Sequence, residues 1–188
     1  LEDVNGNVLQ KRDRQSFAIL HQVAGEYVGS FFNDTLTLNV GARLPFFKRD
    51  LENYCFTTAA NGNVDCFNQD PTLNDRYAAA NPTVQGPQRR VLKYNKLLPN
   101  VGVIYDFTRN LSGFVNYAKG LSVPGTDNLY NAFFFPADTE QAKPDPETTD
   151  TFDAGLRFRS SKVQAQIAGW FTKFNDRLAS AYDPELDR

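Results

Sequence analysis

Hydrophobic and polar residues alternate with a period of two along much of this chain. The clearest run covers residues 35–46, where every second residue is apolar. The apolar residues of this run are Leu36, Leu38, Val40, Ala42, Leu44 and Phe46. Successive side chains of a β-strand point to opposite faces, so the pattern predicts a strand with one apolar and one polar face. Residues 163–174 show the same alternation, with Ile167 and Phe171 on the apolar side.

Four less regular segments complete a predicted set of about six antiparallel strands. The set covers residues 16–32, 35–46, 96–107, 111–121, 148–159 and 163–174. Pro99 lies early in the third strand and has no N–H for a ladder hydrogen bond, which predicts a bulge or a later strand start at this point. No segment predicts a helix longer than a turn or two.

The connections between these strands differ greatly in length at the two ends of the sheet. Short polar turns, typical of hairpins, follow the first, third and fifth strands. Long loops of residues 47–95 and 122–147 follow the second and fourth strands. Compact soluble domains seldom contain such loops, whereas outer-membrane barrels combine short periplasmic turns with long extracellular loops.

Aromatic residues gather near both ends of the predicted strands, as they do at the two interfaces of a membrane. The residues near the short turns are Phe31, Phe32, Tyr105, Phe107 and Phe158, and those near the long loops are Phe46, Phe47, Tyr117 and Phe171. We therefore expect an all-β fold, an up-and-down segment of a transmembrane β-barrel. The alternative is a soluble β-sandwich whose core these rings would fill.

Composition narrows the function classes further. The 20 basic and 22 acidic residues nearly cancel, so no overall field favours nucleic acid. No run approaches the roughly 18 apolar residues of a membrane helix. Cys55 and Cys66 lie in a polar loop, which predicts a disulfide and an oxidising compartment, with two free thiols as the alternative.

Few residues of the sequence suggest catalysis or metal binding. His21 is the only histidine, and no nucleophile and carboxylate pattern accompanies it. The carboxylates Asp145, Glu147 and Asp150 lack the spacing and the glycine of a calcium-binding loop. We therefore expect no catalytic residues, no metal site and no cofactor.

Several motifs resemble those of TonB-dependent outer-membrane receptors. They are Leu-Thr-Leu-Asn-Val-Gly-Ala-Arg at residues 36–43, Leu-Leu-Pro-Asn-Val at 97–101, Tyr-Ala-Lys-Gly-Leu-Ser-Val-Pro at 117–124, Asn-Leu-Tyr at 128–130 and Pro-Asp-Pro-Glu-Thr-Thr-Asp at 144–150. The resemblance implies a barrel of about 22 strands, of which residues 1–188 supply about six. The family's plug, its TonB-contacting box and its last strand are expected outside these residues.

The same resemblance implies a function. The expected activity is ligand-gated import across the bacterial outer membrane, powered through TonB, of a ferric siderophore, a cobalamin-like molecule or a glycan. Expected partners are this metal chelate or oligosaccharide, outer-membrane lipid and, through the plug, the TonB complex, with no nucleic acid. The alternatives are a passive porin, an outer-membrane enzyme barrel and a soluble carbohydrate-binding sandwich.

Candidate ligand-binding residues come from the alternation and from the long loops. The alternation places Arg43, Lys96, Asn100 and Asn116 on the face toward the barrel lumen. The loops add Arg89, Arg90 and Tyr130. Cations with aromatic rings on exposed loops suit a bulky, partly anionic ligand, and they suit glycans equally.

Overall fold

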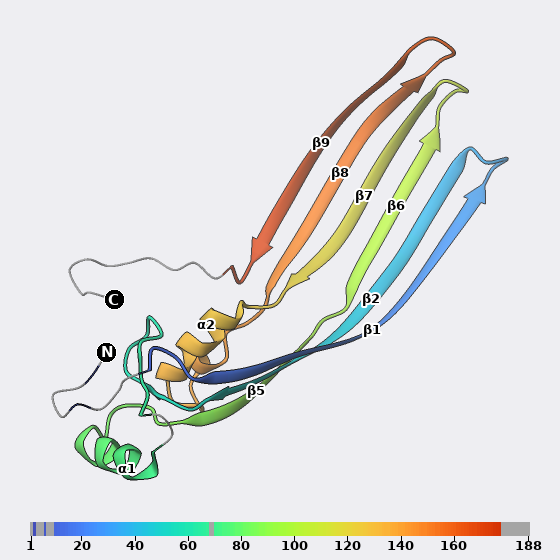
Figure 1. Cartoon of the computed structure of the whole chain (residues 1–188). Helices are drawn as coiled ribbons and strands as arrows, with labels where there is room; N and C mark the ends of the chain where they lie inside the picture. The colour runs from blue at the N-terminus through green and yellow to red at the C-terminus, as the bar shows by residue number, and fades with distance from the viewer. Residues whose placement is uncertain (1, 3–5, 7–9, 68–69, 178–188) are drawn as a thin grey trace.

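The computed structural model describes residues 2, 6, 10–67 and 70–177, and most of them form one antiparallel sheet. The sheet follows the order of the chain: β1 (Arg14–Phe31), β2 (Leu36–Asn53), β6 (Leu98–Asp106), β7 (Leu111–Ser122), β8 (Glu147–Arg159) and β9 (Gln164–Asn175). A further strand, β5 (Gln88–Asn95), pairs with the far end of β2. Figure 1 shows the strands side by side with three tight turns at one end, the short-turn end.

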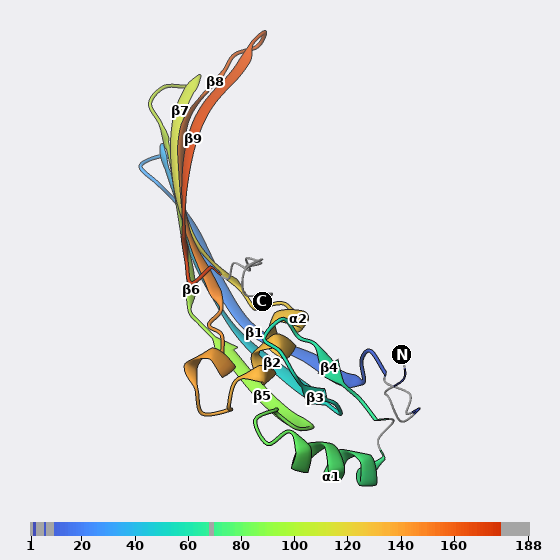
Figure 2. The same cartoon turned by 90° about the vertical axis from the view of Figure 1, so that its left-hand side faces the viewer.

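The remaining elements gather at the opposite end, the long-loop end (Figures 1 and 2). They are β3 (Phe56–Thr57), β4 (Val64–Asp65), α1 (Pro71–Ala80), α2 (Thr126–Asn131) and the 3-10 helices η1 (Ala132–Phe134) and η2 (Glu140–Ala142). Among the described residues, no helix has the length and apolar character needed to cross a membrane.

The prediction that no helix exceeds two turns is wrong, because α1 has 10 residues. Asp70 caps its N-terminus by accepting hydrogen bonds from the backbone N–H groups of Thr72 and Leu73, and Pro71 occupies the first turn. A capping carboxylate followed by proline is a frequent helix start, so a local signal was present in the sequence.

The predicted loop of residues 47–95 also contains more strand than expected. β2 continues seven residues past Phe46 to Asn53, and β5 pairs with this extension. Phe46 pairs with Asn95 and Arg43 pairs with Leu98, so β5 and β6 share one register. They are interrupted at Lys96 and Leu97, next to Pro45, which has no N–H to donate to the ladder.

The short turn between β1 and β2 shows how a hairpin forms without glycine. Phe32, Asn33 and Asp34 have positive φ angles of 56°, 56° and 65°. Tight hairpin turns that match the twist of the strands require positive φ, and Asn and Asp tolerate it better than most residues. The register then pairs Phe31 with Leu36.

The two faces of the sheet differ in composition over the short-turn half. One face presents apolar side chains that are largely exposed, among them Val23, Val115 and Ile167 at 68%, 57% and 73%. Figure 2 shows a single curved layer with no second sheet over this face. A sandwich would cover these side chains, so the soluble sandwich does not describe this structure, and a bilayer is the environment that suits them.

We predict that Val40→Arg will destabilise the full-length protein by about 2 to 4 kcal/mol in a bilayer. Val40 lies on the apolar face between Tyr27 and Val101, so the change would place a charge in lipid. The measurement is urea unfolding of the protein refolded into vesicles.

The control is Asn39→Arg on the neighbouring position, whose side chain lies on the polar face 2.7 Å from Glu26. An arginine at this position would retain a carboxylate partner, so it should be tolerated. Equal losses for the two variants would contradict the assignment of the faces.

Candidate functional site

A packed loop unit closes over the far end of the sheet. We define it as residues 123–146, which contain α2, η1 and η2, together with the part of β2 and β5 that they cover. Its buried core consists of Leu51, Leu92, Tyr94, Leu129, Tyr130 and Phe133, with Phe47 and Val123 packed against it. Leu51 and Leu92 flank Arg49 and Arg90 on the face that is continuous with the polar face of the barrel half. The loop therefore folds over the inner side of the curved sheet.

Arg90 ties this loop to β5. Its guanidinium donates hydrogen bonds to the carbonyl oxygens of Ala132 (2.9 Å), Phe133 (3.4 Å) and Phe135 (2.7 Å). The same group lies 4.6 Å from the centre of the Phe133 ring. Carbonyls at the end of a short helix lack partners within it, and Arg90 supplies them. Burial lowers the pKa of Arg90, and its Nε donates a further hydrogen bond to Oε1 of Gln88 at 2.9 Å.

Tyr130 anchors the same loop to β1 and β2. Its hydroxyl lies within hydrogen-bond distance of the carbonyl oxygens of Gln15 (2.8 Å) and Glu52 (3.2 Å). The guanidinium of Arg14 lies 4.4 Å from the centre of its ring. Burial raises the pKa of Tyr130. The expectation that Arg90 and Tyr130 lie on an exposed loop surface is therefore wrong, since both are buried at 8% and 5% exposure.

Arg89 lies on the opposite face of β5 and is exposed. It forms two hydrogen bonds of 2.8 Å to the carboxylate of Asp50, which Lys48 also approaches at 3.2 Å. The paired arginine lowers the pKa of Asp50 to about 2. Arg89 thus has an ion-pair partner in the sheet, and its expected role in ligand binding stays a prediction.

The polar face of the barrel half has a continuous set of amide side chains. Asn39 donates to Glu26 (2.7 Å) and lies 3.5 Å from Asn100. Asn116 donates to Asp153 at 3.2 Å. The three asparagines line one hollow of about 310 Å³ on this face. The structure thus brings two predicted site residues, Asn100 and Asn116, together with a third amide.

Glycines on the neighbouring strands make room for these amides. A Cβ added at Gly41 would lie 2.6 Å from Oδ1 of Asn100, and one added at Gly102 would lie 2.9 Å from Oδ1 of Asn116. Each asparagine therefore lies across the backbone of its neighbour, a packing that only glycine permits at these positions.

Comparison with known proteins identifies this arrangement. A family model described as the TonB dependent receptor-like β-barrel matches residues 4–187. The chain belongs to this family. Its receptors are transporters of the bacterial outer membrane and not enzymes. The expected fold class, membrane and lack of enzymatic function are thereby confirmed.

The receptor segment also resembles solved structures. One is the copper transporter OprC, with a TM-score of 0.55 and 18% sequence identity over 81% of this chain and 21% of that chain. At this identity the likeness shows the fold alone. The receptor segment spans about a fifth of the length of that transporter.

Two cations on the wall of the receptor barrel, Arg43 and Lys96, have no partner among the residues that the structure describes. Arg43 pairs with Ala24 and Leu98 on the polar face, and the shared register of β5 and β6 places Lys96 opposite Pro45. Lys96 is two positions from Leu98, the partner of Arg43, which makes Arg43 and Lys96 diagonal neighbours. Residues in this relation are about 7 to 8 Å apart. Among the described residues, neither side chain forms an ion pair or a hydrogen bond.

Sequence reasoning missed Arg49, a third cation of this wall. It lies on the same face of β2 as Arg43, and its Nε is buried without a hydrogen-bond partner in the described part of the chain. The sequence interpretation placed it in a loop because the strand was expected to end at Phe46. Phe47 and Leu51, two apolar residues on the same face of an extended chain, were the signal that the strand continues.

A small lobe at the same end is closed by the predicted disulfide. Cys55 and Cys66 are joined, with their Cα atoms 4.5 Å apart. Beside the disulfide, the rings of Phe56, Phe67 and Tyr77 pack together with centres 4.8 to 6.4 Å apart. Tyr77 donates to Asp65, and burial raises its pKa to about 12. This lobe therefore holds α1 against β3 and β4.

Metal ligation has no support in the described residues. They contain no group of three or more His, Cys, Asp or Glu side chains able to hold a metal ion. His21 lies on the apolar face opposite Phe46.

We predict that Arg90→Leu will destabilise the loop unit by about 1 to 3 kcal/mol, because three carbonyls would lose a buried donor. Hydrogen exchange of the amides of residues 129–135 in the full-length receptor is the measurement, and it should accelerate.

Arg89→Leu is the matched control. This exposed residue pairs with Asp50 on the other face, and exposed ion pairs contribute only about 0 to 1 kcal/mol. If both variants accelerate exchange in the loop to the same extent, Arg90 does not anchor it.

Proposed function

We propose that this chain is the wall segment of an active importer that takes up a bulky nutrient across the outer membrane with energy from TonB. Family membership supports TonB coupling, and the amide-lined polar face supports a lumen through which a hydrophilic ligand passes. TonB would act through the plug that receptors of this family hold in the barrel. The long-loop end would face the outside, because barrels of this kind place short turns in the periplasm.

The observation that carries the ligand proposal is that Arg43 and Lys96 have no ion-pair partner in the described part of the chain. Arg43 lies on β2, whose neighbours on both sides belong to this chain, and Lys96 lies in the break between β5 and β6, opposite Pro45 of β2. Glu26 and Asp153 on the polar face are bound by Asn39 and Asn116, and among the described residues no carboxylate pairs with Arg43 or Lys96. Charge-assisted hydrogen bonds to carboxylates or phosphates are about twice as strong as neutral ones, so an anionic group would be held here.

Asn39, Asn100 and Asn116 extend this site with donors and acceptors. Amide side chains bind hydroxyl, carbonyl and amide groups. We propose a partly anionic ligand with many hydrogen-bonding groups, for which a ferric siderophore is the first candidate. Cobalamin-like molecules and anionic glycans share some of this chemistry. The copper cargo named for OprC has no counterpart in the residues described here, where no cluster of metal ligands occurs.

Uptake assays with a strain that carries the full-length gene test this proposal. We predict that Lys96→Gln combined with Arg43→Gln will weaken binding of an anionic ferric siderophore roughly ten- to a hundredfold, as the loss of charged hydrogen bonds implies. The measurement is uptake of a panel of radioiron-loaded siderophores, cobalamin and oligosaccharides, with and without a proton uncoupler.

Lys93→Gln is the control, because Lys93 lies on β5, three residues before Lys96, but pairs with Lys48 on the outer face. It should leave uptake unchanged. Uptake that persists with the uncoupler would contradict TonB coupling, and equal effects of the two sets of variants would contradict the ligand site.

Sidedness is tested with protease added to intact cells. We predict cleavage between residues 57 and 90, at a rate that increases after mild reduction of the Cys55–Cys66 disulfide. In the chain-entropy model a loop of this size is stabilised by roughly 3 kcal/mol, so reduction should loosen the lobe. The turns at residues 32–35 and 160–163 should be protected. Cleavage at these turns alone would reverse the proposed orientation.

A further inference from the structure

One short pattern recurs on three strands of the sheet at its long-loop end. On β2, β7 and β9 an aromatic residue is followed, two positions nearer the long loops, by a lysine: Phe46 by Lys48, Tyr117 by Lys119 and Phe171 by Lys173. Residues two apart on a strand share a face, and all of these lie on the outer face, which is the apolar face of the barrel half. The lysines therefore lie where the lipid-facing band ends.

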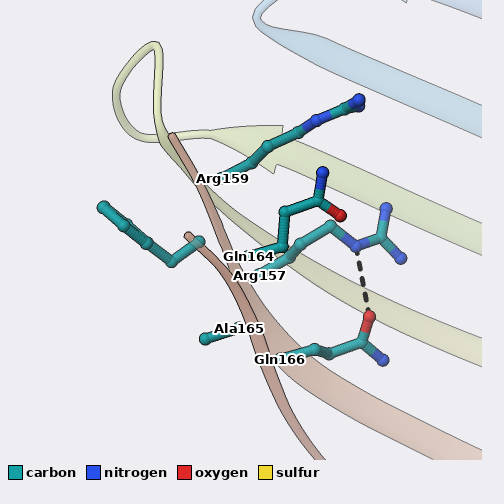
Figure 3. Close-up of a pocket in the computed structure, with 6 residues that line it drawn as sticks. Arg157, Arg159, Gln164, Ala165 and Gln166 are labelled. Carbon is teal, nitrogen blue, oxygen red and sulfur yellow. Dashed lines mark hydrogen bonds between the residues drawn. The ribbon is translucent and has the colours of Figure 1, made fainter. Parts of the chain in front are cut away.

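Cations are unevenly distributed over this outer face. The described strands carry no lysine or arginine there on the short-turn side of the three aromatic rings. The cations of β8 near the short turns lie on the inner face instead: Figure 3 shows Arg157 and Arg159 extending to one side of the ribbon, whereas Ala165 of β9 points to the other. Lysines that only anchor a barrel in polar surroundings would suit both ends, so their restriction to one end favours an anionic layer at one membrane surface.

Two of these lysines flank one carboxylate. Asp150 of β8 pairs with Lys119 of β7 on one side and with Lys173 of β9 on the other. Its oxygens accept hydrogen bonds from Nζ of Lys119 (3.0 Å), the hydroxyl of Tyr117 (2.8 Å) and Nδ2 of Asn175 (3.2 Å). An ammonium group has three donors, of which this ion pair uses one. Lys119 is thus held in one orientation with donors left for a further acceptor.

The cluster combines positive charge with exposed aromatic rings. Lys173 forms no ion pair among the described residues, so two ammonium groups stand against one carboxylate. On the short-turn side of these cations, the side chains of Phe152 and Phe171 are exposed at 49% and 63%. Phe152 packs against Tyr117, with ring centres 4.8 Å apart. A molecule that fits this surface has an anionic part and an apolar part, in this order from the long-loop end.

We propose that Lys119 and Lys173, together with the rings of Phe152 and Phe171, bind a phosphorylated glycolipid of the outer leaflet. The phosphate would lie at the two ammonium groups, and the acyl chains would lie along the rings. The amide of Asn175 supplies an oxygen that can accept from a sugar hydroxyl. A soluble phosphate would not use the rings, and a neutral lipid would not use the lysines. The site rests on the proposed orientation, with the long loops outside, and is independent of the imported ligand.

Binding of diphosphorylated lipid A to the full-length receptor in detergent micelles, followed by native mass spectrometry, tests this site. We expect Lys119→Gln with Lys173→Gln to raise the Kd roughly tenfold or more, because charged contacts with phosphate are lost. Lipid A without phosphates should bind the wild type and this variant equally. Arg109→Gln with Lys162→Gln is the matched control, since it removes the same charge from two short turns, and it should leave the Kd unchanged.

Lys173→Gln alone separates lipid binding from folding. Lys119 belongs to the hydrogen-bonded group around Asp150, so its loss also weakens the pairing of β7 with β8. Lys173 makes no such contact among the described residues. We expect its replacement to raise the Kd roughly fivefold, while the urea midpoint of the receptor in vesicles stays the same.

Equal Kd values for the double variant and the turn control would overturn the proposal. Displacement of lipid A by an equal concentration of phosphatidylglycerol would also overturn it, because the site would then take any anionic lipid. Displacement by millimolar inorganic phosphate would assign the lysines to a soluble anion. The micelle measurement does not depend on which end faces outside, and the protease experiment determines that orientation separately. The expected Kd change together with cleavage at the short turns alone would contradict the outer-leaflet assignment.

Discussion

Backbone hydrogen bonding without water is the constraint on which the rest of this structure depends. Inside a bilayer each N–H and C=O must find a partner within the protein, and a closed antiparallel sheet satisfies that demand. The ladder from β1 to β9 provides these partners for its inner strands, and its last register pairs Thr148–Arg159 of β8 with all of β9. Once the chain is extended, side chains alternate between lipid and lumen. Whether a residue is at an odd or an even position then decides its environment.

The change of environment along β2 follows from the same rule. Up to Phe46 the even positions are apolar because lipid covers them, whereas beyond it Phe47 and Leu51 place apolar side chains on the opposite face. The cover has changed from lipid outside to the loop unit inside. Arg89 and Arg90 are neighbours in sequence and have opposite surroundings for this reason. Arg89 binds Asp50 on the outer face, and Arg90 donates to a carbonyl of η1 within the core.

The alternation predicted the strands and the polar positions of Arg43, Asn100 and Asn116, because the period of two is a local property. The burial of Arg90 and Tyr130 was not predictable in this way. Their partners lie 42 to 45 and 78 to 115 residues away in the chain. Local signals did exist for α1, in Asp70 and Pro71, and for β5, in the alternation of Arg90, Leu92 and Tyr94. They were overlooked because a long polar segment was interpreted as loop throughout.

The strand geometry also distinguishes cations that stabilise the fold from cations that remain available to bind a ligand. Arg89 is paired with Asp50 on the outer face and Arg90 with carbonyls of the loop unit, and these contacts hold β5 and the loop unit in place. Arg43, Arg157 and Arg159 lie on β2 and β8, whose neighbours on both sides are described, and Lys96 lies between β5 and β6. None of the four forms an ion pair among the described residues. Because the contacts of Arg89 and Arg90 already order the loop unit, ligand binding does not have to offset the entropy cost of ordering it. The charged positions of the wall, rather than the tips of the loops, are therefore where selectivity would arise.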